Sequence, residues 1–262
     1  MEATTIGMNR TGTAMSPNDV KAMNDAADAL SPAMPIDTTA AEAERQMYIN
    51  ESETVGSIPP PASMKGVLKA GMAKIKGGAP SVLMDKLGER LAFERSGTRL
   101  YEALILKYES IQALGTEVLP SANGFGAALG TVSDESPIDT LMRIREEELE
   151  HFKMLGRAME KMGGDPTAMT PCANISAVQN MGIMQVITDP RTTLAQCLNA
   201  ILTAELSDNA GWELLIKLTH EAGEAELTAQ FRSALDQEQE HLAIVKGWLE
   251  HLVTQGAGTA AV

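Results

Sequence analysis

The residues best suited to chemistry form two Glu-x-x-His motifs far apart in the chain. Glu148 and His151 lie in a strongly helical run that begins at Arg143, and Glu238 and His241 lie in a second run. Residues three apart share one face of a helix, so each motif directs a carboxylate oxygen and an imidazole nitrogen toward one point. The chain has only four histidines, and two of them stand in this frame.

Both motifs interrupt an apolar seam of heptad spacing. The first seam includes Leu141, Ile144 and Leu155, and the second includes Phe231 and Val245. The motifs therefore occupy positions that normally carry Leu or Ile in a packed core. An unpaired carboxylate is costly in a core, so these groups need protons, counter-charges or a metal ion.

Two further predicted helices carry acids on their inward seams. The seam from Leu87 to Tyr108 contains Glu94, and the seam from Leu194 to Leu215 contains Glu205 and Asp208. Four seams thus carry an acid near the middle, and two of them have His at the next turn. This is a ligand set for a pair of metal ions.

Helix ends place the acids at one level. We expect the first helix to begin near Ser81 and the third near Pro190. The second helix should end at Gly163 and the fourth near residue 253. At about 1.5 Å per residue, the four seams bring their acids to a similar depth, roughly 20 Å from one end of an antiparallel bundle.

This pattern resembles the ferritin-like di-iron carboxylate superfamily, which includes rubrerythrin-like and bacterioferritin-like four-helix bundles, over about residues 81–253. The resemblance implies an all-α, antiparallel four-helix bundle with one long crossover, here preceded by an N-terminal extension. It also implies the metal ligands Glu94, Glu148, His151, Glu205, Asp208, Glu238 and His241.

Two of the candidate residues have particular roles by resemblance. Asp208, three residues after Glu205, is similar to the extra acid of rubrerythrin-like members. It would bind a metal, orient a histidine or form a salt bridge. Tyr101, seven residues after Glu94, resembles a tyrosine that flanks the metal pair in bacterioferritin-like proteins. Tyr101 is the candidate catalytic residue, and we expect it to hydrogen-bond a carboxylate rather than carry a radical.

The implied cofactor is two iron ions, with two manganese ions or a mixed pair as alternatives. The expected function is oxygen- or peroxide-dependent redox chemistry, such as ferrous iron oxidation or rubrerythrin-like peroxide reduction, so dioxygen or peroxide would be the partner. One alternative is a di-manganese catalase-like enzyme or a di-iron oxidase of an organic substrate. Another is a non-enzymatic ferritin-like scaffold or metal carrier.

Composition narrows the class of protein. A formal charge of −14 disfavours nucleic acid and anionic membranes as main partners. No apolar run reaches membrane-spanning length, so no integral membrane segment is expected. The two cysteines, Cys172 and Cys197, form no C-x-x-C motif, which favours a cytoplasmic location.

The chain divides into four parts by composition. Residues 1–63 are poor in aromatics and predict an extended, largely irregular arm with one short helix near residues 40–48. Residues 64–79 predict a short basic amphipathic helix that docks on the acidic bundle. Residues 80–255 form the bundle, and residues 256–262 are a flexible tail.

Two connections within the bundle are long. Residues 116–136 exceed the few residues that join most bundle helices, which fits a lid, an oligomer contact or a tolerated surface loop. Residues 165–189 form the crossover and include a short helix near residues 175–186, and Asp189-Pro190 is expected to cap the third helix. With its arm and inserted loop, the chain is expected to form a homo-oligomer such as a dimer rather than a closed storage cage.

Overall fold

The computed structural model describes residues 17–34, 37–52, 80–115, 119–125 and 135–259. The chain divides into two units, residues 1–54 and 55–262. In the first unit, α1 (Pro17–Leu30) and α2 (Thr39–Glu51) are helices without buried residues. Helix α2 covers the stretch predicted to be helical, whereas α1 lies where we expected irregular chain. Pro17 and Asp19 in the first turn of α1 favour a helix start. The basic helix predicted for residues 64–79 lies outside the described residues.

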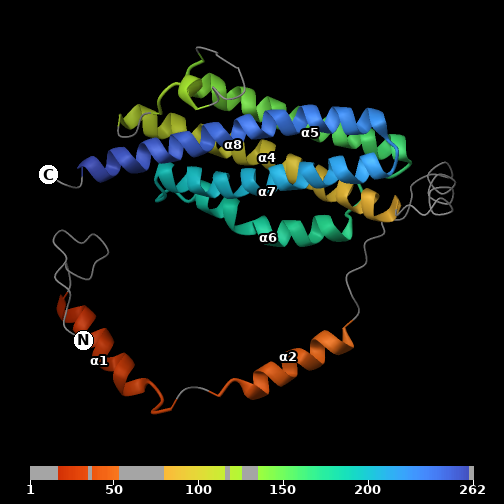
Figure 1. The fold of residues 1–262 in the computed structure, drawn as a ribbon. Coiled ribbons are helices and arrows are strands. Elements are labelled where there is room, and N and C mark those ends of the chain that lie inside the picture. Colours follow the sequence, from red (N-terminus) through yellow and green to blue (C-terminus); the bar gives the residue numbers. More distant parts are fainter. Residues whose placement is uncertain (1–16, 35–36, 53–79, 116–118, 126–134, 260–262) are drawn as a thin grey trace. The chain divides into compact units, whose positions relative to one another are not determined.

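Four long helices form the second unit: α4 (Pro80–Leu114), α5 (Pro137–Met162), α7 (Leu194–Glu221) and α8 (Ala225–Thr259). Helices α4 and α8 run in one direction, and α5 and α7 run in the other (Figure 1). Helix α4 packs against α5 and α7, and α8 packs against α7 and α5. The predicted all-α bundle is confirmed.

Local sequence sets the ends of α5. The Ser136 hydroxyl accepts a hydrogen bond from the backbone N–H of Asp139, and Pro137 occupies the first turn. The helix ends at Gly163, whose φ of 87° is costly for any residue with a Cβ. Both ends match the sequence prediction.

The start of α7 differs from the prediction. The N-cap is Thr193, not Asp189-Pro190. Thr193 and Gln196 form a reciprocal capping box, which satisfies two backbone N–H groups at once. Asp189 instead terminates the preceding helix and binds Arg191.

The crossover contains helix α6 (Pro171–Thr188), longer than the segment expected at residues 175–186. It packs against α4 and α7 and carries the chain back along the bundle (Figure 1). The other long connection lies partly outside the described residues. Its described part includes a short 3-10 helix, η1 (Ala122–Gly124), and the Pro120 carbonyl accepts a hydrogen bond from the Trp248 indole. Among the described helices, none is long and apolar enough to cross a bilayer.

The core has two apolar clusters separated along the bundle. Helix α4 contributes Leu87 and Leu91 to one cluster and Leu104 and Tyr108 to the other. Glu94 lies between these two sets on the same helix. The other three helices alternate in the same way, so a polar layer is enclosed by apolar packing on both sides.

Candidate metal centre

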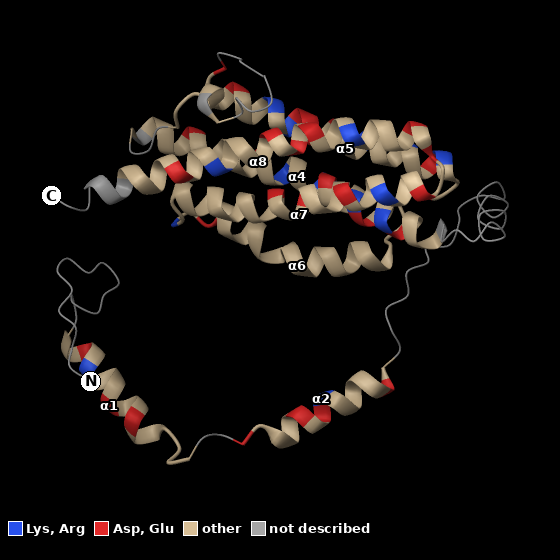
Figure 2. Cartoon of the chain, viewed as in Figure 1, with Lys and Arg blue, Asp and Glu red and all other residues tan. Residues whose placement is uncertain are grey.

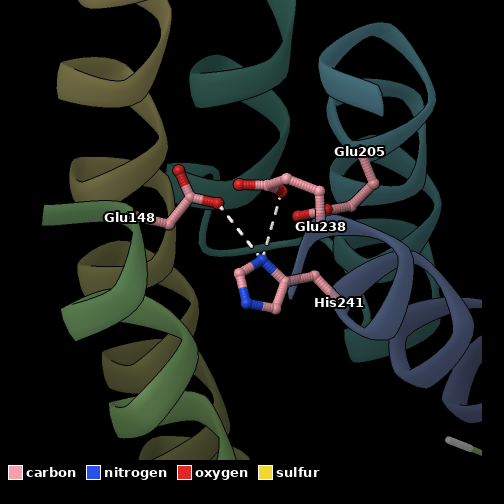
Figure 3. Close-up of side chains that lie close together, drawn as sticks. All are labelled: Glu148, Glu205, Glu238 and His241. Carbon is pink, nitrogen blue, oxygen red and sulfur yellow. Dashed lines mark hydrogen bonds and ion pairs between the residues drawn. The ribbon is translucent and has the colours of Figure 1, made fainter. Parts of the chain in front are cut away.

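The polar layer contains all seven predicted ligands. Each is at most 3% exposed to solvent, although five are acids. Side chains from α5, α7 and α8 converge in Figure 3, where Glu148, Glu205 and Glu238 lie on one side of the His241 ring. The structure therefore brings together residues that are distant in sequence and keeps them from water.

The donor atoms form overlapping groups, and within each group all the atoms lie within 4.8 Å of one another. Glu238 belongs to every group, so it lies between two possible ion positions. The groups are Glu94, His151 and Glu238; Glu148, Glu205, Glu238 and His241; and Glu94, Glu148, Asp208 and Glu238.

Both histidines turn the same nitrogen inward. His151 Nδ1 lies 2.7 Å from Glu238 Oε1 and 3.7 Å from Glu94 Oε2. His241 Nδ1 lies 3.2 Å from Glu238 Oε2 and 3.6 Å from Glu148 Oε1. The two Nδ1 atoms thus contact different oxygens of the Glu238 carboxylate.

The outer nitrogens contact two residues that the sequence reasoning missed. His241 Nε2 lies 2.7 Å from Glu147 Oε2, and His151 Nε2 lies 2.9 Å from Gln237 Oε1. Glu147 and Gln237 directly precede the glutamates of the two motifs, and each reaches across to the histidine of the other helix. An acceptor at Nε2 holds the proton there and leaves the Nδ1 lone pair for a metal.

A buried cation, also missed from sequence, lies beside this layer. Arg90 is 4% exposed, and its Nη1 donates to the Asp208 carboxylate and, at 3.1 Å, to the Asp208 carbonyl. Its Nε is 3.9 Å from Glu94 Oε1, and its guanidinium lies 4.0 Å from the centre of the Phe93 ring. Of the three roles expected for Asp208, the structure shows the salt bridge.

Tyr101 forms the expected hydrogen bond. Its hydroxyl donates to Glu205 Oε1 at 2.5 Å, and its ring centre lies 6.5 Å from that of His241. Helix α4 also approaches the acids through Gly97, where an added Cβ would overlap Glu148 Oε2. Gly97 therefore leaves room for the Glu148 carboxylate.

Burial changes the protonation of the cluster. Burial and neighbouring carboxylates raise the pKa of Glu94 to about 7 and those of Glu148 and Glu205 to about 8. Burial disfavours a charged His151, but hydrogen bonds and charge interactions with Glu238 and Glu94 raise its pKa to about 11. Burial likewise opposes ionisation of Glu238, yet the two histidines lower its pKa. Without metal, protons hold this cluster together.

The residues fit a pair of divalent cations. Within the described structure, both Glu94 oxygens and one oxygen each of Glu148 and Glu205 are buried without a hydrogen-bond partner. The five acids and Arg90 leave four formal negative charges, which two divalent ions would neutralise. Buried acceptors normally have partners, so these atoms are arranged for cations.

A comparison with known families agrees with this geometry. The family model of the ferritin-like domain matches residues 139–254. Residues 139–254 are thus similar to a ferritin-like domain, which is consistent with the bundle and its buried acids. The match spans nearly all of α5 and most of α8, and it includes α6 and α7. Helix α4, with Glu94 and Tyr101, precedes the match and packs against α5 and α7. No curated protein and no solved structure gave a significant match.

Proposed function

We propose that the ferritin-like domain binds two iron ions and uses them in oxygen- or peroxide-dependent redox chemistry. The observation that carries the proposal is the sharing of Glu238 among the three groups of buried donors. In this assignment Glu148 and Glu238 would hold both ions, Glu94 and Glu205 would each hold one ion, and each histidine would hold one ion. A bound iron pair would supply the electrons for reduction of dioxygen or peroxide.

The chain's own groups suit this task. Carboxylates with imidazoles bind iron or manganese well. The apolar clusters on both sides exclude bulk water from the centre. Burial and the negative charge of Glu205 raise the pKa of Tyr101, so its phenol keeps its proton and donates to that carboxylate. Tyr101 thereby orients a terminal ligand.

A homo-oligomer such as a dimer also belongs to the proposal. Helix α6 contains no Asp, Glu, Lys or Arg, as its uniform tan colour in Figure 2 shows. Val178 and Met181 on this helix are 64% and 59% exposed. Exposed apolar side chains on a charge-free helix favour association between copies. Sedimentation velocity of the full-length chain tests it, and a monomer at all concentrations would contradict it.

Metal loading tests the central claim. The anaerobically purified chain should bind two ferrous ions per chain and change its near-ultraviolet absorbance when oxygen or peroxide is added. The Glu148→Ala/Glu238→Ala variant should fold, by circular dichroism, yet lose both ions. If this folded variant keeps two ions, the ligand assignment is wrong.

Two further experiments distinguish the alternative functions. The manganese-loaded chain is tested for oxygen release from peroxide, which would favour a catalase-like function. An iron-loaded chain that responds to neither oxygen nor peroxide would favour a scaffold or metal carrier and would contradict the redox proposal.

A further inference from the structure

Arg90 occupies a place built for a buried guanidinium. Its planar group lies over the Phe93 ring, and an added Cβ at Gly211 would come within 2.6 Å of its Nη1. Glycine at this position of α7 therefore makes the room that the cation needs. A guanidinium is costly to bury without a carboxylate, and Asp208 is the carboxylate that it contacts most closely.

Asp208 has two competing uses. One is the ion pair with Arg90. The other is metal binding, since an Asp208 oxygen lies within 4.8 Å of oxygens of Glu94, Glu148 and Glu238. A carboxylate in this position would bind an ion if nothing else held it.

Charge balance decides between the two uses. Four glutamates neutralise two divalent ions, and Asp208 with Arg90 forms a separate neutral pair. Moving Asp208 onto the metals would place a fifth negative ligand there and leave the Arg90 guanidinium buried without its closest partner. Spacing along the chain agrees, because the residue three after Glu94 is Gly97, whereas the residue three after Glu205 is Asp208. The extra acid is therefore present on α7 only, and Arg90 reaches it from α4.

We propose that Arg90 is a positioning residue that holds Asp208 out of the ligand set, so that the metal pair is bound by four glutamates and two histidines. This inference rests on the proposed di-metal function. Asp208 would then lie beside the metal centre without binding it, and Arg90 would determine the number of protein ligands.

Cobalt(II) provides a readout of ligand number that is independent of activity. The intensity of its visible absorption bands falls when the coordination number rises. The full-length chain is loaded with two cobalt ions, and its spectrum is compared with those of Arg90→Gln, Asp208→Asn and the double variant. The double variant keeps the wild-type net charge and serves as the matched control.

Asp208→Asn alone should leave the bands unchanged, because Asp208 is not a ligand while Arg90 holds it. Arg90→Gln should weaken the bands as Asp208 joins the metals, and chelator competition should show binding about tenfold tighter. The double variant should return both readings toward wild type. If Arg90→Gln does not fold, the comparison of wild type with Asp208→Asn still decides whether Asp208 binds metal, and a changed spectrum there overturns the inference.

Two results would overturn the inference while leaving the di-metal proposal intact. One is a changed spectrum in Asp208→Asn, which would mean that Asp208 already binds metal. The other is an Arg90→Gln spectrum identical to that of the double variant. A wild-type chain that binds no pair of cobalt ions would instead overturn the di-metal proposal itself.

Discussion

Replacing Glu147 with Gln should weaken one of the two ion positions and leave the other unchanged. The Glu147 carboxylate lies 2.7 Å from His241 Nε2, whereas the corresponding contact of His151 is to the neutral amide of Gln237 at 2.9 Å. Burial opposes ionisation of Glu147, but its hydrogen bond to His241 lowers its pKa, so it is charged at neutral pH. A charged acceptor makes imidazole a more basic ligand than an amide does.

The structure also bounds the size of the effect. Loss of such an outer partner commonly costs 10- to 100-fold in metal affinity. The Glu147 side chain is 20% exposed and also binds Arg143 at 3.0 Å, so part of its charge is already compensated. We therefore expect the low end of the range, about tenfold or ~1.4 kcal/mol. Arg143 keeps its contact with Glu240 in the variant, so the fold should not change.

Calorimetric titration of the metal-free chain with cobalt(II) measures both affinities. Glu147→Gln should weaken only the ion bound by His241. The reciprocal variant Gln237→Glu places a carboxylate on His151 and should strengthen the other ion. Equal loss at both positions in Glu147→Gln, or no loss at either, would refute the reasoning, because the contact reaches only one imidazole.

Two more predictions follow from the geometry and protonation of the centre. Gly97→Ala should displace the Glu148 carboxylate and reduce the number of metal ions bound, although Ala is favoured over Gly in a helix interior by about 1 kcal/mol. Gly156→Ala is the control, because its added Cβ would meet only an ordinary contact, and it should bind two ions normally. The metal-free chain should melt at lower temperature as pH rises from about 5 to about 8, because the raised pKa values of Glu94, Glu148 and Glu205 make the folded state bind more protons there than the unfolded state. Metal-loaded chain should show the opposite trend, since bound ligands must be deprotonated, and scanning calorimetry of both forms at each pH checks this. A metal-free melting temperature that rises with pH would contradict the assignment of protons to these acids.

Much of the fold was predictable because its signals are local. Seam periodicity gives the inward face of each helix, and the Ser136-Pro137 start and Gly163 end of α5 are set by adjacent residues. Equal depth of the acids then follows from helix length alone, which explains why the sequence could predict that Glu94 and Glu205 would meet the two motifs.

Contacts between helices were harder to predict. Arg90 lies beside its seam, where a charged residue normally faces water, and only the gap left by Gly211 on α7 lets it enter the core. Glu147 and Gln237 precede their motifs by one position, but their partners lie on the opposite helix and depend on its rotation. The start of α7 was mispredicted because Asp189-Pro190 is also a good cap by composition, and the Thr193 capping box three residues later satisfies more backbone groups.

If the centre binds two ions as proposed, its departures from symmetry should make the two ions differ. The ligands themselves are paired by spacing: an acid on α4 matches one on α7, and the motif of α5 matches that of α8. The residues next to them are not equivalent, because corresponding positions carry different residue types: Gly97 corresponds to Asp208, Glu147 to Gln237, and Tyr101 to Trp212. Each matched pair therefore differs in charge or hydrogen bonding. Two ions in such surroundings should bind in a fixed order and differ in reduction potential, so the first equivalent of metal should occupy the position of His241, whose outer nitrogen contacts a carboxylate. A spectrum of the half-loaded chain that is altered by Glu147→Gln would support this order, and a spectrum that Glu147→Gln leaves unchanged would exclude it.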